Sequence, residues 1–311
     1  MLKKFLFTVI LILATALCAS GLSFAAPHQL QNPNLNWGNT CGLDAKLPPP
    51  GLYFSNYIVD YSADKLTDPN GDKLMNDPVD AVVYAPQFIY VHDKKYFQDY
   101  NAGFQLFPTI LQSYNPNDNL NNLTSNEGNF GDLIFGPFIG KTAQLAEGFN
   151  LHWIFEFDTY FPIGEYNENK TFNPGANYWT FEPWVTLTME MPYGLTVGTR
   201  QHLAYNTENE DTDKQNGILY HFNYSVWKNL SPLLKNLQIG AVGYYGKQLT
   251  ENEDNGNDIN GSKEEVFAIG PAVSWKAPTG TTIRLKGYFE SGAENRPEGE
   301  KVVLRLIQKL L

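Results

Sequence analysis

The sequence predicts an all-β fold: a transmembrane antiparallel up-and-down β-barrel of about twelve strands. Two observations predict it. Apolar and polar residues alternate with period two over segments of about ten residues, the length of a tilted strand that crosses a membrane. Long polar connections also alternate with shorter ones, which places the long loops on one side of the strands and the short turns on the other.

The chain begins with a segment typical of a secretory signal peptide, expected over residues 1–25. Two lysines precede an apolar run at 5–17, and residues 23–25 carry the small residues of a cleavage site. A membrane anchor is the alternative, but the run is shorter than the roughly 20 residues of a spanning helix. We therefore expect export through the Sec pathway, which leaves Cys41 as a lone cysteine with no internal disulfide.

Residues 26–50 form a polar, asparagine-rich N-terminal segment ahead of the first strand. Trp37, Cys41 and Leu43 are the candidates for a plug that folds up into the barrel lumen. The two apolar side chains among them would otherwise lie in water. A segment that hangs free below the barrel is the alternative, and the three prolines at 48–50 would act as a stiff spacer into the first strand.

The barrel itself is expected over residues 51–311. The expected strands cover 51–62, 79–92, 100–113, 131–140, 149–161, 178–190, 195–206, 217–228, 237–249, 264–276, 281–291 and 301–310. The expected long loops are 63–78, 114–130, 163–176, 206–216, 250–263 and 292–300, and the short links are 93–99, 141–148, 191–194, 229–236 and 277–280. A soluble two-sheet sandwich also alternates, but it has no reason to sort its loops by length.

Charged side chains decide which face of each strand points inward, because an arginine or lysine at the bilayer midplane costs roughly 2–4 kcal/mol. The aromatic-rich face is therefore expected to contact lipid. The residues expected to line the lumen are His152, Glu156, Asp158, Glu182, Arg200, His202, Arg284, Lys286 and Arg305. They form either a charged constriction that selects permeants or a set of mutually paired charges that fills the interior.

Several motifs occur in order between about residues 48 and 300. Examples are Pro-Pro-Pro-Gly-Leu-Tyr at 48–53, Phe-Pro-Ile-Gly-Glu-Tyr at 161–166, Asn-Tyr-Trp-Thr-Phe-Glu-Pro at 177–183 and Ala-Glu-Asn-Arg-Pro-Glu-Gly at 293–299. Together they resemble the barrel family named for the MetA pathway of phenol degradation. The resemblance implies an outer-membrane β-barrel that moves hydrophobic or aromatic compounds, and it supplies no functional residues. The chain departs from the usual aromatic end of such barrels, since it closes with Lys309-Leu310-Leu311.

The charge balance excludes some partners. The chain has 22 Lys+Arg against 33 Asp+Glu, and no basic cluster lies outside its extreme N-terminus, so we expect no nucleic-acid binding. The expected partners are membrane lipid, lipopolysaccharide and small hydrophobic or aromatic solutes, in the outer membrane of a Gram-negative bacterium. Acidic loops at 208–213 and 251–258 could hold divalent ions, but solvated charge is the simpler interpretation.

The leading functional hypothesis is a barrel that lets small hydrophobic or aromatic compounds pass. A closed structural or surface-interaction barrel is the alternative. A barrel-embedded hydrolase is a third hypothesis, but His221 and Ser225 stand too far apart along one strand to hydrogen-bond. We therefore expect no enzyme, no cofactor and no metal ligands.

Overall fold

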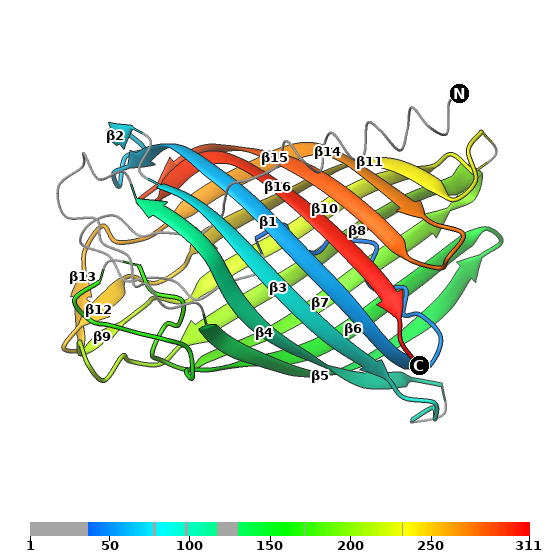
Figure 1. The fold of residues 1–311 in the computed structure, drawn as a ribbon, viewed down its shortest axis with the longest axis horizontal. Coiled ribbons are helices and arrows are strands. Elements are labelled where there is room, and N and C mark those ends of the chain that lie inside the picture. Colours follow the sequence, from blue (N-terminus) through cyan, green and yellow to red (C-terminus); the bar gives the residue numbers. More distant parts are fainter. Residues whose placement is uncertain (1–36, 77–78, 97–98, 117–129, 171, 232) are drawn as a thin grey trace.

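The computed structural model describes residues 37–76, 79–96, 99–116, 130–170, 172–231 and 233–311. It confirms the predicted fold: twelve antiparallel strands follow one another around a barrel, and the last pairs with the first (Figure 1). The barrel strands are β1 (Gly51–Thr67), β3 (Val79–Val91), β4 (Asn101–Pro116), β5 (Phe130–Ala146), β6 (Phe149–Phe161), β7 (Thr180–Met191), β8 (Leu195–Asn206), β10 (Leu219–Asn229), β11 (Leu237–Gln248), β14 (Glu265–Lys276), β15 (Thr282–Glu294) and β16 (Pro297–Lys309).

Closure depends on the pairing of β1 with β16, which runs antiparallel from Tyr53 opposite Lys309 to Leu66 opposite Pro297. This pairing leaves no open edge in the sheet, as hydrocarbon requires. Within the described residues, no helix is long and apolar enough to cross a membrane.

The alternation in the sequence becomes an alternation of exposure. In β6, Phe155 and Phe157 are 43% and 39% exposed, whereas Glu156 and Asp158, which alternate with them, are buried. Successive side chains of a strand point to opposite faces, so one apolar face covers the outside while the polar face fills the inside. Large apolar residues are exposed in the same way on most other barrel strands, for example Phe104, Leu187, Leu203, Val226, Ile239 and Phe267. This outer surface suits contact with lipid.

The longer connections gather at one end of the barrel, which we call the loop end (Figure 1). They contain four short strands, β2 (Lys73–Asn76), β9 (Lys214–Gln215), β12 (Asn252–Asp254) and β13 (Asn257–Ile259), of which the last three form a small sheet. At the opposite, short-turn end, the backbone of Leu52 is hydrogen-bonded to those of Leu310 and Leu311. The turn between β7 and β8 at this end contains a single 3₁₀ turn, η1 (Pro192–Gly194).

Two predicted connections were wrong. Residues 292–300 are not a long loop, because β15 reaches Glu294 and β16 starts at Pro297, with only a two-residue turn between them. Most of the link at 141–148 also belongs to β5. Polar residues indicated a loop at both places, but a strand that continues beyond the hydrocarbon region has no need for an apolar outer face. The asparagine-rich stretch at 115–129 and the predicted signal peptide lie largely or wholly outside the described residues.

Candidate functional site

Residues 37–47, which we call the inner segment, run between the inner faces of the barrel strands. Its backbone N–H groups donate to wall side chains: Gly38 to Asn223 Oδ1 at 2.9 Å and Gly42 to Ser225 Oγ at 3.1 Å. These two acceptors lie on β10. A buried backbone must find such partners, and the polar inner face of the barrel supplies them.

Two buried lysines hold the carbonyl groups of the same segment. Lys286 Nζ donates to the carbonyl oxygens of Gly38, Asn39 and Thr40. Lys301 Nζ donates to the carbonyl oxygen of Trp37 at 2.9 Å. Both lysines are therefore partnered by backbone dipoles, an arrangement that fixes the path of the segment.

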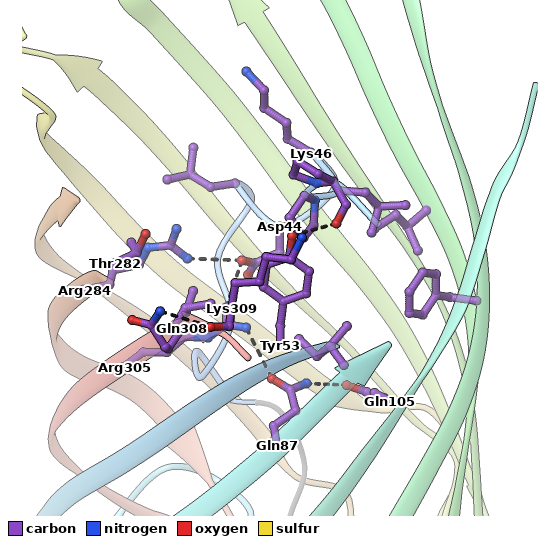
Figure 2. A pocket seen from close by; sticks show the side chains of 18 of the residues that line it. Asp44, Lys46, Tyr53, Gln87, Gln105, Thr282, Arg284, Arg305, Gln308 and Lys309 are labelled. Carbon is purple, nitrogen blue, oxygen red and sulfur yellow. Dashed lines mark hydrogen bonds and ion pairs between the residues drawn. The ribbon is translucent and has the colours of Figure 1, made fainter. Parts of the chain in front are cut away.

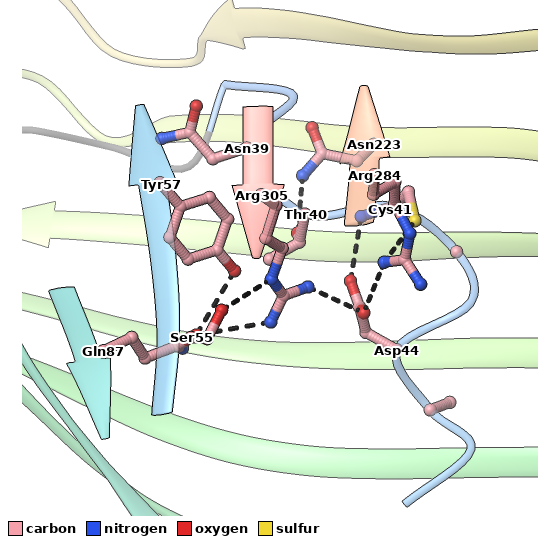
Figure 3. A network of polar contacts seen from close by, with 12 residues as sticks. Asn39, Thr40, Cys41, Asp44, Ser55, Tyr57, Gln87, Asn223, Arg284 and Arg305 are labelled. Atoms are coloured by element: carbon pink, nitrogen blue, oxygen red, sulfur yellow. Dashed lines mark hydrogen bonds and ion pairs between the residues drawn. The ribbon is translucent and has the colours of Figure 1, made fainter. Parts of the chain in front are cut away.

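Asp44 anchors the segment to two arginines on adjacent strands. Its Oδ1 lies 2.8 Å from Arg305 Nη1 and 3.1 Å from Arg284 Nη1, while its Oδ2 accepts from the Cys41 backbone N–H at 2.9 Å (Figure 3). Burial opposes ionisation of Asp44. The two guanidiniums more than offset that effect and hold the pKa of this carboxyl well below its usual range.

The indole of Trp37 fills a recess in the wall on the loop side of the segment. It stacks on the ring of His221 with centroids 5.2 Å apart, and the Arg296 guanidinium lies 4.6 Å from its centroid. Gly246 leaves the space for it: a Cβ at that position would stand 2.0 Å from the indole. The fit depends on a glycine at this position of β11.

We expect Gly246→Ala to destabilise the protein by about 1–3 kcal/mol, because the added methyl group overlaps the indole. Thermal unfolding in detergent measures the effect. Gly287→Ala is the matched control, since a Cβ there meets nothing within 4 Å. In a Trp37→Ala background the Gly246→Ala change should cost much less. An equal cost with and without the indole would contradict this account.

Across the lumen, buried carboxylates form a second polar cluster. Asp158 accepts hydrogen bonds from Trp184 Nε1 and from Gln105 Nε2, each at 2.8 Å. The guanidinium of Arg200 lies 3.5 Å from the Trp184 ring centroid. Gly136 makes room for the carboxylates, because a Cβ there would fall 1.9 Å from Asp158 Oδ1.

The loop end of the lumen is filled by an ion-pair network around Arg296. This guanidinium lies 3.5 Å from Glu264 and 3.4 Å from Glu290, and the phenols of Tyr61 and Tyr244 each donate to Glu290 at 2.6 Å. Burial raises the pKa of Glu264 to about 7, with Arg296 opposing the rise. Buried charges that satisfy one another in this way leave little room for a solute.

The short-turn end, by contrast, holds a cavity of about 500 Å³ beside the inner segment (Figure 2). Its polar lining includes Asp44, Gln87, Gln105, Glu156, Arg200, Arg284, Arg305, Gln308 and Lys309. Much of the remaining wall is apolar or aromatic and consists of Leu43, Leu47, Tyr53, Ile89, Phe138, Ile154 and Trp184. A smaller cavity of about 300 Å³ lies nearby and includes Lys46 and Glu190. The larger cavity has the size and composition of a small-molecule site.

All nine side chains predicted to line the lumen are buried. Arg284, Lys286 and Arg305 meet the inner segment, as described above. His152 lies apart from the others, between Thr142 and Glu190 near the short turns. The predicted plug residues Trp37 and Cys41 are buried, and Leu43 packs against the same core.

Asp44 and Trp184 were not predicted as lumen residues. Asp44 lies in an irregular segment, where no periodicity assigns a face, and its two arginines are 240 and 261 positions away in the chain. Trp184 was not singled out, although it shares the buried register of Glu182 on β7. The considered hydrolase pair is not formed, since Ser225 Oγ accepts from Gly42 and His221 Nε2 lies 2.7 Å from Glu182 Oε1.

Comparison with known proteins gives one strong family match. The model of the family described as "Putative MetA-pathway of phenol degradation" matches residues 63–306. No curated protein matches the chain in sequence.

One of the solved structures that resemble this chain shares its fold. An outer membrane channel from Pseudomonas putida F1 superimposes with a TM-score of 0.73 at 14% identity, covering 85% of this chain and 97% of that one. The KdgM porin, solved in complex with oligogalacturonate, gives a TM-score of 0.43 at 7% identity, covering 83% and 99% of the two chains. The outer membrane phospholipase A from Escherichia coli gives 0.42 at 11% identity, covering 89% and 100%. The last two likenesses are too weak to carry an argument.

Proposed function

This chain belongs to the family described as "Putative MetA-pathway of phenol degradation", and on that premise we propose that it is an outer-membrane channel for small hydrophobic or aromatic compounds. One observation carries the proposal: the 500 Å³ cavity at the short-turn end, whose wall is largely apolar. A barrel with a merely structural role has no need for such a cavity. Apolar walls with a few fixed polar groups are typical of sites that hold small organic molecules.

The inner segment supplies the selectivity in this proposal. It occupies the lumen between the cavity and the ion-pair network of the loop end, so a solute passes only when the segment shifts. Trp37, Cys41 and Leu43 act as the plug, and Asp44 holds it against Arg284 and Arg305. The channel is therefore closed at rest. In this closed state the charged residues bind the plug, and they are not free to contact a permeant.

Uptake by intact cells tests the proposal. A strain that lacks the protein should take up radiolabelled phenol severalfold more slowly than the complemented strain, with glycerol uptake unchanged. Phe138→Ala removes an aromatic side chain from the cavity wall and should reduce the ratio of phenol to glycerol uptake. Phe135→Ala, an exposed position on the same strand, is the matched control and should preserve it. Equal phenol uptake with and without the protein would exclude the function.

A closed structural barrel is the second candidate, and the dense pairing of the interior favours it. Lys286, Lys301 and Asp44 each hold the inner segment, and Arg296 closes the loop end. In this case the segment never leaves the lumen. Wild-type protein in planar bilayers separates the two candidates: a channel shows open events, whereas a closed structural barrel shows none.

A further inference from the structure

Two histidines and a glutamate from three neighbouring strands meet inside the barrel wall. His202 on β8 stands directly opposite His221 on β10, and Glu182 lies on β7, the next strand around the barrel. Glu182 Oε1 is 2.7 Å from His221 Nε2 and 3.2 Å from His202 Nδ1, and all three side chains are fully buried. We propose that these three residues bind a divalent transition-metal ion of the zinc type.

The donor atoms have the spacing of a metal site. One ligand atom from each side chain lies within 4.8 Å of the other two. To bind an ion at about 2.0–2.2 Å from each donor, Glu182 Oε1 would have to move away from His221 Nε2, which lies 2.7 Å from it. Three protein ligands leave one tetrahedral position for a water molecule.

The donor types select the class of ion. Two imidazole nitrogens and one carboxylate suit zinc, nickel, cobalt or copper. Calcium and magnesium prefer sites built entirely from oxygen atoms. The proposal therefore differs from the expectation from sequence that the chain has no metal ligands. The sequence did not show that β7, β8 and β10 bring these three side chains together.

A second observation points to a ligand independently of the spacing. Among the described residues, His202 Nε2 and His221 Nδ1 have no hydrogen-bond partner, and His202 Nδ1 has only its 3.2 Å contact with Glu182 Oε1, which lacks hydrogen-bond geometry. Leaving a buried polar atom unpaired costs about 1–3 kcal/mol. A bound ion would satisfy His202 Nδ1 and would replace the single shared carboxylate oxygen as the centre of the cluster.

Surrounding groups orient the proposed ligands. The Tyr160 phenol donates to Glu182 Oε2 at 2.6 Å, which leaves Oε1 for the ion. The two imidazole rings stack with centroids 4.2 Å apart, and the indole of Trp37 stacks on the other side of the His221 ring. Such outer contacts usually hold metal ligands in place. Trp37 also links the site to the inner segment.

Zinc binding to the purified, refolded full-length barrel tests the proposal. After removal of metals with EDTA, the wild-type protein should bind one zinc ion per chain, measured by isothermal titration and by elemental analysis after gel filtration. The His202→Ala and His221→Ala variants should each weaken binding at least about a hundredfold. His152→Ala removes a buried histidine far from the cluster and should leave the stoichiometry unchanged.

Cobalt gives a readout that does not depend on folding of a variant. Cobalt-loaded wild-type protein should show the visible absorption bands of a tetrahedral or five-coordinate site with nitrogen ligands. A spectrum of hydrated cobalt alone, or zinc binding unchanged in both histidine variants, would overturn the proposal. Neither result bears on phenol uptake, so failure of the metal site and failure of the channel function remain distinguishable.

Discussion

A barrel in which residues 37–47 are replaced by a glycine-serine linker of equal length should conduct at least about tenfold more current in planar bilayers than the wild type. The inner segment runs through the lumen and is hydrogen-bonded to β7, β10, β15 and β16. A twelve-stranded barrel is wider than an eight-stranded one, whose interior is just filled by side chains. A glycine-serine linker keeps the backbone N–H and carbonyl groups but lacks the Trp37 indole and the Asp44 carboxylate that hold the segment in place.

The control replaces residues 253–258, at the tip of a loop, by the same kind of linker. This change leaves the interior untouched and should leave the conductance low. Both variants must keep the heat-dependent shift in gel mobility that marks a folded barrel. A folded variant without the inner segment that conducts no better than the wild type would show that the segment does not block the lumen.

The second large effect is expected from Asp44→Asn. This change leaves Arg284 and Arg305 buried without their shared carboxylate, and breaking a buried ion pair in this way costs about 3–5 kcal/mol. This lost free energy weakens the docking of the inner segment in the lumen. Open events should therefore become frequent in single-channel records. Glu190→Gln is the matched control, because the Lys46–Glu190 pair is partly exposed and is worth about 1 kcal/mol or less.

The same carboxylate predicts how conductance depends on pH. Because the pKa of Asp44 is lower in the docked state than its ordinary value of 3.8, its contribution to docking is complete above that value. It is lost as the pH falls below 3.8 towards the lowered pKa. Wild-type conductance should therefore stay low from about pH 5 to 8 and rise in stronger acid. If Asp44→Asn kept the same acid-induced step, the step would belong to another group.

The inner and outer faces of the strands were predictable residue by residue. Along β6, Phe155 and Phe157 point outward and Glu156 and Asp158 inward, as the period of two requires. The alternation depends on the strand alone, because a pleated strand places neighbouring side chains on opposite faces whatever the rest of the chain does. The face that carries the charges must then be the inner one, since a charged side chain in contact with lipid costs free energy.

The ends of strands were less predictable. The turn at residues 295–296 could not be located within its polar stretch. Polar residues show where the strands leave the hydrocarbon layer, but the strands stay hydrogen-bonded to each other beyond that point. The Asn295 backbone, with a φ of 55°, allows the tight reversal there. Asparagine tolerates this left-handed conformation better than most residues.

By itself, the sequence determined the kind of barrel, the approximate number of its strands and the alternation of side chains between the two faces of a strand such as β6. Only the tertiary structure decided which inward residues meet. Asp44 reaches two arginines about 240 and 260 positions away, and Glu182, His202 and His221 converge from three strands. The reason is physical: alternation is fixed within each strand, whereas the register between strands and the path of the inner segment follow from closing the whole barrel.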